Sequence, residues 1–427
     1  MSIAEKFQTF LSNIKIDNDE QISSRYADIT VCLNKNFRDT SSATANNLQV
    51  GSYGRWTAIR GVSDLDMIYI MPDSKWDSYN VVGGQAKLLS DTKDALKARY
   101  PRTDIYVDSP VVRVLYTNFH VEVQPAFEQD DGSFKFPDTR SGGSWKVTKP
   151  RDEIEAMKDT NIEKNRNLRR LCKMARAWKN KHGVAMGGLL IDTLAYNFLK
   201  STNAYDARSY LYYDWMSRDF FKYLADEPEK ERYAALGSGQ HVKVKDAFQK
   251  DAGKAYELCV SAISVSGSDT ENSKWQKVFG ARFPAPEKQM AKASSRVFRE
   301  TEEFIEDRFP VDIRYKLKID CEVTQNGFQP RRLRGMLGKN FKLGAQKSLK
   351  FEVADIKVPG TYDLYWKVLN RGDEAERRDC VRGQIVEDSG HQAVSEHTDF
   401  AGDHVVECYA VKNGVVVAKD RIHVPIE

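Results

Sequence analysis

The sequence has no C-x-x-C pair, no long apolar run and no strong excess of charge of either sign. Its six cysteines lie far apart, a spacing typical of reduced, buried thiols and not of a disulfide framework or a zinc site with paired ligands. No uninterrupted apolar segment approaches the roughly 20 residues that a membrane-spanning helix needs. The net charge of +4 is the small difference between 65 basic and 61 acidic residues, which is too weak to indicate a nucleic-acid partner by itself.

The first residues, "MSIAEKFQTF", also lack the basic region and apolar run of a signal peptide. We therefore expect a cytoplasmic protein that does not enter a membrane. A chain of 427 residues with 41% apolar residues is long enough for two or three domains, each with a proper core.

Changes in hydrophobic periodicity divide the chain into several regions. The first 45 or so residues show helical spacing, and short strands follow from Leu48 to about Phe127, where "VVRVLY" and "FHVEVQP" predict a hairpin. Residues 151 to about 300 are predicted to be mainly helical. After about residue 305 short alternating segments return, with a favoured hairpin turn at Asn413-Gly414, and they predict a small β-sandwich.

Two aspartates stand at the start of an apolar strand in "SDLDMIYI". Residues i and i+2 of a strand share a face, so Asp64 and Asp66 should point to the same side, about 6.5–7 Å apart along the backbone. Hard oxygen ligands with this spacing suit Mg²⁺ ions about 3.5–4 Å apart, as in two-metal sites. An isolated D-x-D is also common at ordinary strand ends, so the pair needs support from other residues.

One supporting feature is the "GSYG" stretch about ten residues upstream. A Gly-Ser turn that enters a helix leaves backbone N–H groups available to a phosphate, and Ser52 adds a hydroxyl donor. Gly51 and Gly54 would allow close approach of the backbone. A plain helix N-cap by Ser52 is the alternative.

A second supporting feature is "FHVEVQP", in which Glu122 lies between two valines of a predicted strand. A carboxylate in such a place costs stability unless another group pairs with it, and a metal ion shared with the two aspartates would do so. A solvated face of an edge strand is the alternative. The conjunction of the glycine turn, the D-x-D pair and the later strand acid is the specific signal.

Together, "GSYGRWTAIRGVSDLD" and the later "VEVQPA" resemble the nucleotidyltransferase signature of the DNA polymerase β-like superfamily. Within it the sequence resembles most the cGAS/DncV-like nucleotidyltransferases, the bacterial CD-NTases with a SMODS-type catalytic domain that act in anti-phage signalling. This likeness covers roughly residues 1–300. The remainder, with "YWKVLNRGDEAERR", "RGQI" and "FAGDHVVECYA", resembles the C-terminal sensor-like domain of some bacterial members.

The resemblance implies an α+β fold: a polymerase-β-like core made of a mixed sheet with helices, then a helical second lobe, then a small all-β sandwich domain. Residues 1–300 would form the bilobal nucleotidyltransferase domain, with the catalytic sheet to about 130 and the helical lobe at 150–300. Residues 306–427 would form the sandwich.

The resemblance also implies roles for individual residues. Asp64, Asp66 and Glu122 would be the catalytic metal ligands for two Mg²⁺ ions, with Mn²⁺ as a possible substitute; many relatives have Asp where this chain has Glu122. Gly51 and Ser52 would hold the triphosphate. In "LRRLCKMARAWK", Lys173 and Arg176 lie one helical turn apart and would bind phosphates; a solvated basic helix face is an equally favoured reading.

The implied activity is the joining of NTPs, ATP or GTP foremost, into a cyclic di- or trinucleotide second messenger that activates a separate effector protein. The zinc insertion of relatives that double-stranded nucleic acid switches on has no counterpart here, so no obligatory nucleic-acid activator is expected. Two alternatives stay open: nucleotidyl transfer to an RNA or protein acceptor, and a nucleotide-sensing binding protein with a degenerate catalytic domain.

Overall fold

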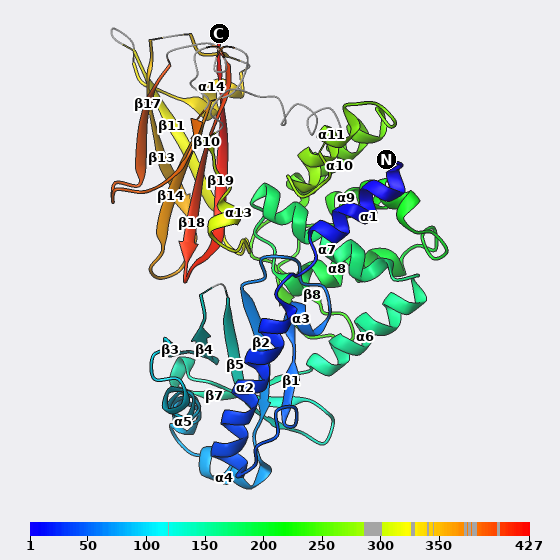
Figure 1. The fold of residues 1–427 in the computed structure, drawn as a ribbon, viewed down its shortest axis with the longest axis vertical. Helices are drawn as coiled ribbons and strands as arrows, with labels where there is room; N and C mark the ends of the chain where they lie inside the picture. The colour runs from blue at the N-terminus through cyan, green and yellow to red at the C-terminus, as the bar shows by residue number, and fades with distance from the viewer. Residues whose placement is uncertain are drawn as a thin grey trace. The chain divides into compact units, whose positions relative to one another are not determined.

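The chain folds into two compact units (Figure 1). The computed structural model describes residues 1–117, 119–285, 301–325, 329–339, 341–344, 346–370, 374, 377, 382–398 and 402–427. Unit 1 comprises residues 1–177, 187–267 and 274–284; unit 2 comprises residues 178–186, 268–273 and 285–427. The domain boundary predicted near residue 300 lies outside the described residues. The short segment Trp178–Met186 groups with unit 2.

The core of unit 1 is a seven-stranded mixed sheet in which only β2 and β5 run parallel. Its order is β1-β2-β5-β4-β3, and β6 and β7 continue from β5. The hairpin predicted for "VVRVLY" and "FHVEVQP" is confirmed as the antiparallel pair β4–β5. The strand bounds are β1 Asn47–Gln49, β2 Asp64–Ile70, β3 Ile105–Asp108, β4 Val111–Leu115, β5 His120–Glu128, β6 Phe134–Asp138 and β7 Ser144–Thr148.

One face of this sheet is buried by helices, as the alternation of β2 predicts. Leu65, Met67 and Tyr69 are fully buried and share one apolar cluster with residues of α2 (Asp19–Arg38) and α5 (Gly84–Arg99). The acids of β2 are therefore left on the other face, away from this core. Two short helices complete this lobe: α3 Gly51–Gly54 and α4 Trp76–Tyr79.

The remaining part of unit 1 is mainly helical, as predicted, and it includes the N-terminal helix α1 (Ile3–Asn13). Phe7 of α1 is fully buried, and its ring lies 5.1 Å from that of Trp275 and 5.3 Å from that of Phe283. The other elements are α6 Pro150–Glu163, α7 Asn167–His182, α8 Gly188–Lys200, α9 Tyr213–Asp226, α10 Gln249–Ile263, α11 Glu271–Phe279, and the hairpin of β8 Arg232–Ala234 and β9 His241–Lys243. The last residues of α7 and the first of α11 belong to unit 2.

Unit 2 is a β-sandwich of two four-stranded antiparallel sheets, ordered β12-β11-β13-β17 and β16-β14-β18-β19. A single apolar cluster joins side chains from both sheets. Asn413 and Gly414 both have positive φ and close the predicted β18–β19 hairpin. The bounds are β11 Leu317–Thr324, β12 Arg331–Arg332, β13 Ser348–Ile356, β14 Asp363–Leu369, β16 Ile385–Glu387, β17 Ala393–His397, β18 Gly402–Lys412 and β19 Val415–Ile426.

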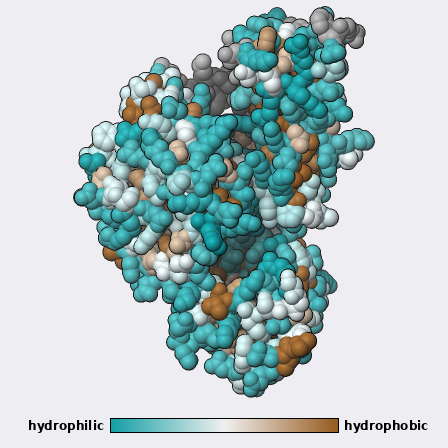
Figure 2. All heavy atoms as spheres, turned by 180° about the vertical axis from the view of Figure 1, so that it is seen from behind, coloured by the Kyte–Doolittle hydropathy of each residue, from teal (hydrophilic) through white to brown (hydrophobic). Residues whose placement is uncertain are grey.

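The predicted fold class, α+β with a following all-β domain, is therefore confirmed. Cysteines 32, 172, 259, 321 and 408 are free and buried, as the cysteine spacing predicts, while Cys380 lies outside the described residues. Within the described ranges, no helix combines the length and the apolar character needed to cross a membrane. The face seen in Figure 2 is mostly hydrophilic, and its apolar side chains form small separate patches.

Candidate active site

The acids of β2 and β5 meet through the parallel pairing of these two strands. Asp66 stands directly opposite Glu122, and Asp64 stands opposite His120. The side-chain alternation of both strands then places Asp66 and Glu122 on one face of the sheet. The neighbouring-strand position predicted for Glu122 is thus the one observed.

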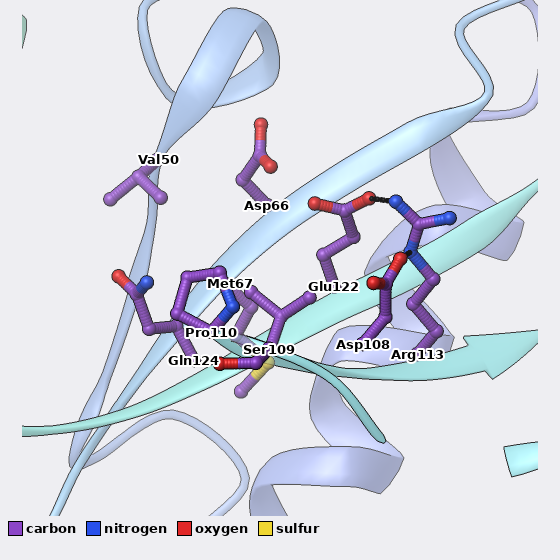
Figure 3. A pocket seen from close by; sticks show the side chains of 10 residues that line it. Val50, Asp66, Met67, Asp108, Ser109, Pro110, Arg113, Glu122 and Gln124 are labelled. Carbon is purple, nitrogen blue, oxygen red and sulfur yellow. Dashed lines mark ion pairs between the residues drawn. The ribbon is translucent and has the colours of Figure 1, made fainter. Parts of the chain in front are cut away.

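Asp66 and Glu122 line a cavity of about 320 Å³ on this face (Figure 3). The cavity lies over β2 and β5, and the turn between β3 and β4 forms one of its sides. Asp64 is not among its lining residues, although it precedes Asp66 by two positions on the same strand face. The residues that line the cavity are Val50, Asp66, Met67, Asp108, Ser109, Pro110, Val111, Arg113, Glu122 and Gln124.

Asp66 is packed against the start of α3. Gly51 has φ +64°, and a Cβ built on it would lie 1.8 Å from Asp66 Oδ2. The backbone carbonyl of Asp66 accepts hydrogen bonds from Val50 N at 3.1 Å and from the Tyr26 hydroxyl at 2.8 Å. Glycine is therefore required at position 51 both for its positive φ and for the space that the carboxylate occupies.

Ser52 lies inside α3, which begins at Gly51 and whose N-cap is Val50. No side chain caps this helix, so the alternative reading of Ser52 as an N-cap is wrong. The carbonyl of Ser52 accepts hydrogen bonds from the backbone N–H groups of Thr57 (2.9 Å) and Ala58 (3.1 Å). These bonds fold the chain after α3 back toward Ser52.

Glu122 pairs with a basic residue that the sequence analysis did not single out. Arg113 of β4 stands opposite it in register, and Arg113 Nη2 lies 2.8 Å from Glu122 Oε1. His120 Nε2 approaches the same oxygen at 3.2 Å. In Figure 3 the other carboxylate oxygen of Glu122 points toward the side of the cavity where Asp66 lies. The sequence did hold a signal for Arg113, because this arginine also lies between valines of a strand, as Glu122 does.

The cavity offers oxygen ligands of the kind that divalent metal ions prefer, since two carboxylates face it from adjacent strands. Within the described residues, however, no group of three or more His, Cys, Asp and Glu side chains is placed to hold a metal ion. One oxygen of Glu122 already has Arg113 as its partner. Asp66 and Glu122 are thus ligands of a suitable type on a shared face of the sheet. A site with three carboxylate ligands stays a prediction.

The two basic residues predicted to bind phosphates lie on α7, outside the lining of the cavity. Arg176 is 5% exposed and forms a bidentate pair with Asp192, through Nη1 to Oδ1 at 2.6 Å and Nη2 to Oδ2 at 2.9 Å. Arg55 joins the same fully buried carboxylate with its Nε at 2.9 Å from Oδ2. This geometry speaks against a phosphate-binding role for Arg176 and against a solvated basic face, because its guanidinium serves a buried ion-pair network.

Lys173 lies in a different environment from Arg176. Burial lowers the pKa of Lys173, and the neighbouring cations Arg169 and Arg176 lower it further. A half-buried lysine among other cations is stabilised when an anion approaches. Lys173 therefore remains the phosphate-binding candidate of α7.

Comparison with known proteins adds to this geometry. Residues 1–161 match the family model of the Second Messenger Oligonucleotide or Dinucleotide Synthetase (SMODS) domain. Residues 299–427 match the model of the Adenylyl/Guanylyl and SMODS C-terminal sensor domain. The chain is also 20% identical, over 280 residues, to a probable cyclic nucleotide synthase of Bacillus cereus (strain VD146), covering 56% of this chain and 82% of that protein.

Among solved structures, CdnC of E. coli MS115-1 in a complex with a HORMA protein superposes with a TM-score of 0.51 at 15% identity. The superposition covers 66% of this chain and 98% of CdnC, and it shows that the two share a fold. With a synthetase domain at one end and its companion sensor domain at the other, the chain is a cGAS/DncV-like nucleotidyltransferase, an enzyme of the cyclic oligonucleotide synthase class.

Proposed function

We propose that this enzyme joins NTPs into a cyclic di- or trinucleotide second messenger in a reaction that depends on Mg²⁺ and serves bacterial anti-phage signalling. The observation that carries the proposal is the juxtaposition of Asp66 and Glu122 across β2 and β5, facing one cavity beside α3. The relation to a probable cyclic nucleotide synthase supports the choice of product. The messenger would act on an effector protein elsewhere.

The side chains of this site would position an NTP for attack by a ribose hydroxyl. Asp64, Asp66 and Glu122 would hold Mg²⁺, which when bound lowers the pKa of the attacking hydroxyl and neutralises the leaving pyrophosphate. The backbone of α3 at Gly51 and Ser52, with Lys173, would bind the triphosphate.

In each step the hydroxyl oxygen bonds to the α-phosphorus, the bond from this phosphorus to the oxygen that bridges the α- and β-phosphates breaks, and the hydroxyl proton leaves to solvent. The last step joins the two ends of one chain. No covalent intermediate with the protein is needed, because the protein positions the substrates and stabilises charge.

The decisive experiment is incubation of the full chain with four labelled NTPs and Mg²⁺, followed by phosphatase treatment and mass determination of the resistant product. A cyclic product from the wild type, absent from Asp66→Asn, is the expected result. Asp73→Asn alters an exposed carboxylate of the same lobe and should keep the activity. Addition of double-stranded DNA should not be required.

Three outcomes would contradict the proposal. A cyclic product from Asp66→Asn equal to that of the wild type would remove the role of the acids. Label found on RNA or protein would indicate transfer to a macromolecular acceptor. NTP binding measured by calorimetry with no turnover over hours would indicate a nucleotide-sensing protein.

A further inference from the structure

Arg113 stands next to the two facing acids of the candidate active site, on the third of three adjacent strands. Asp66 on β2 is opposite Glu122 on β5, and Glu122 is in turn opposite Arg113 on β4. The side chains of Glu122 and Arg113 are each 15% exposed. The arginine thus belongs to the site by position, although neither its sequence motif nor the comparisons assign it a role.

The pairing of Arg113 with Glu122 has an electrostatic reason. Two like charges directly opposite each other on neighbouring strands destabilise a sheet, and burial strengthens their repulsion. The Arg113 guanidinium, 2.8 Å from Glu122 Oε1, supplies the counter-charge. A divalent cation between the carboxylates would supply more positive charge from the other side and would repel the guanidinium.

A second carboxylate lies ready to receive this arginine. Asp108, at the end of β3, has Oδ2 3.2 Å from Arg113 Nε and is half exposed. The contact between Arg113 Nε and Asp108 is an ion pair without hydrogen-bond geometry. The buried Nε–H of Arg113 therefore has no hydrogen-bond partner among the described residues. Tyr106, opposite Arg113 on β3, also contacts the guanidinium. A small rotation of the Arg113 side chain would therefore give its Nε–H a hydrogen bond to the carboxylate of Asp108, which lies beside it (Figure 3).

We propose that Arg113 is a displaceable counter-ion, which holds Glu122 while no metal ion is bound and moves onto Asp108 when Glu122 binds a divalent cation. The inference rests on the proposed function, since it concerns the same metal site. Arg113 is then a positioning residue that acts through Glu122. Its transfer to Asp108 keeps the guanidinium paired in both states, so that no buried charge is left without a partner.

The test measures Mn²⁺ binding to the full chain without nucleotide, by electron paramagnetic resonance of the free ion. Arg113→Gln removes the competitor for Glu122 and should tighten binding by about tenfold. Asp108→Asn removes the second partner and should weaken binding severalfold. In the double variant the Asp108→Asn change should have almost no effect, because the residue acts through Arg113.

Two controls separate this role from simpler ones. Arg151→Gln removes another arginine that is paired with an acid of β5, Glu128, and should leave Mn²⁺ affinity unchanged. Arg113→Lys keeps the positive charge and should bind Mn²⁺ much as the wild type does. If Arg113→Gln fails to fold, Asp108→Asn still decides the question, because Mn²⁺ affinity equal to that of the wild type would overturn the proposal.

Further results would overturn it as well. Weaker Mn²⁺ binding by Arg113→Gln would show that Arg113 has a merely structural role. If Asp108→Asn changed the Mn²⁺ affinity equally with and without Arg113, the charge of Asp108 would act on the metal ion directly and not through Arg113. Asp66→Asn separates the two levels of inference. If it abolishes Mn²⁺ binding while Arg113→Gln changes nothing, only the role of Arg113 fails; if it binds Mn²⁺ as the wild type does, the proposed metal site itself fails.

Discussion

Gly51 lies so close to the carboxylate of Asp66 that a methyl group on its Cα would stand 1.8 Å from Asp66 Oδ2. The contact joins the glycine-rich turn to the D-x-D strand, the two motifs that identified the site in the sequence. It means that the turn shapes the acidic site directly, in addition to the phosphate-binding role that we propose for its backbone.

Gly51→Ala should therefore reduce product formation by roughly a hundredfold, because displacement of a catalytic side chain by about 1 Å has effects of this size. Gly132→Ala is the matched control: Gly132 also has a positive φ, +75°, but a Cβ there meets nothing within 4 Å. Rates of cyclic product formation compare the two. Equal activity of both variants would show that Asp66 has no need of its observed position.

Arg176→Gln should lower the free energy of unfolding by about 3 kcal/mol, because it removes one partner of the buried carboxylate of Asp192. Lys173→Gln should change stability little and should instead raise the KM for NTP. Urea unfolding and steady-state kinetics on both variants measure these effects. If Arg176→Gln is fully stable and weakens NTP binding, the phosphate role would belong to Arg176 after all.

Asp192 should make stability depend on acid pH. Burial alone would raise its pKa, but the ion pairs with Arg176 and Arg55 outweigh burial and lower it from 3.8 to about 2. Its contribution, roughly 2 to 3 kcal/mol, is therefore fully present above about pH 4 and is lost as the pH falls toward 2. The difference in unfolding free energy between wild type and Asp192→Asn should shrink over this interval; a constant difference would contradict the assignment.

Within unit 2, Asp312→Asn should cost about 3 kcal/mol of stability. Lys179, near the end of α7, is buried and places its Nζ 2.7 Å from Asp312 Oδ1; Lys179 and Arg314 hold the pKa of Asp312 below its usual range in spite of burial. Asp363→Asn, at an exposed position of β14, is the control. Denaturant unfolding of the full chain checks the pair, and equal stability of both variants would contradict the prediction.

The candidate site was partly predictable from sequence because its strongest signals are local. The alternation of β2 placed Asp64 and Asp66 on the polar face, and the buried Leu65, Met67 and Tyr69 confirm that reading. The partner of Glu122 could not be read in the same way. Arg113 and Glu122 are nine residues apart in the predicted β4–β5 hairpin, and they face each other because of its register, which the alternation of "VVRVLY" alone does not specify.

The sequence by itself indicated the order of the main helical and strand regions, the sandwich hairpin at Asn413-Gly414, the resemblance to the family, and the residue types gathered for the site. These follow from interactions between residues near each other in the chain, such as side-chain alternation, turn conformation and motif spacing. Only the tertiary structure decided that Arg176 and Arg55 serve one buried carboxylate, that of Asp192. A charge takes its role from the charges and the solvent around it, and packing brings those neighbours from distant parts of the chain.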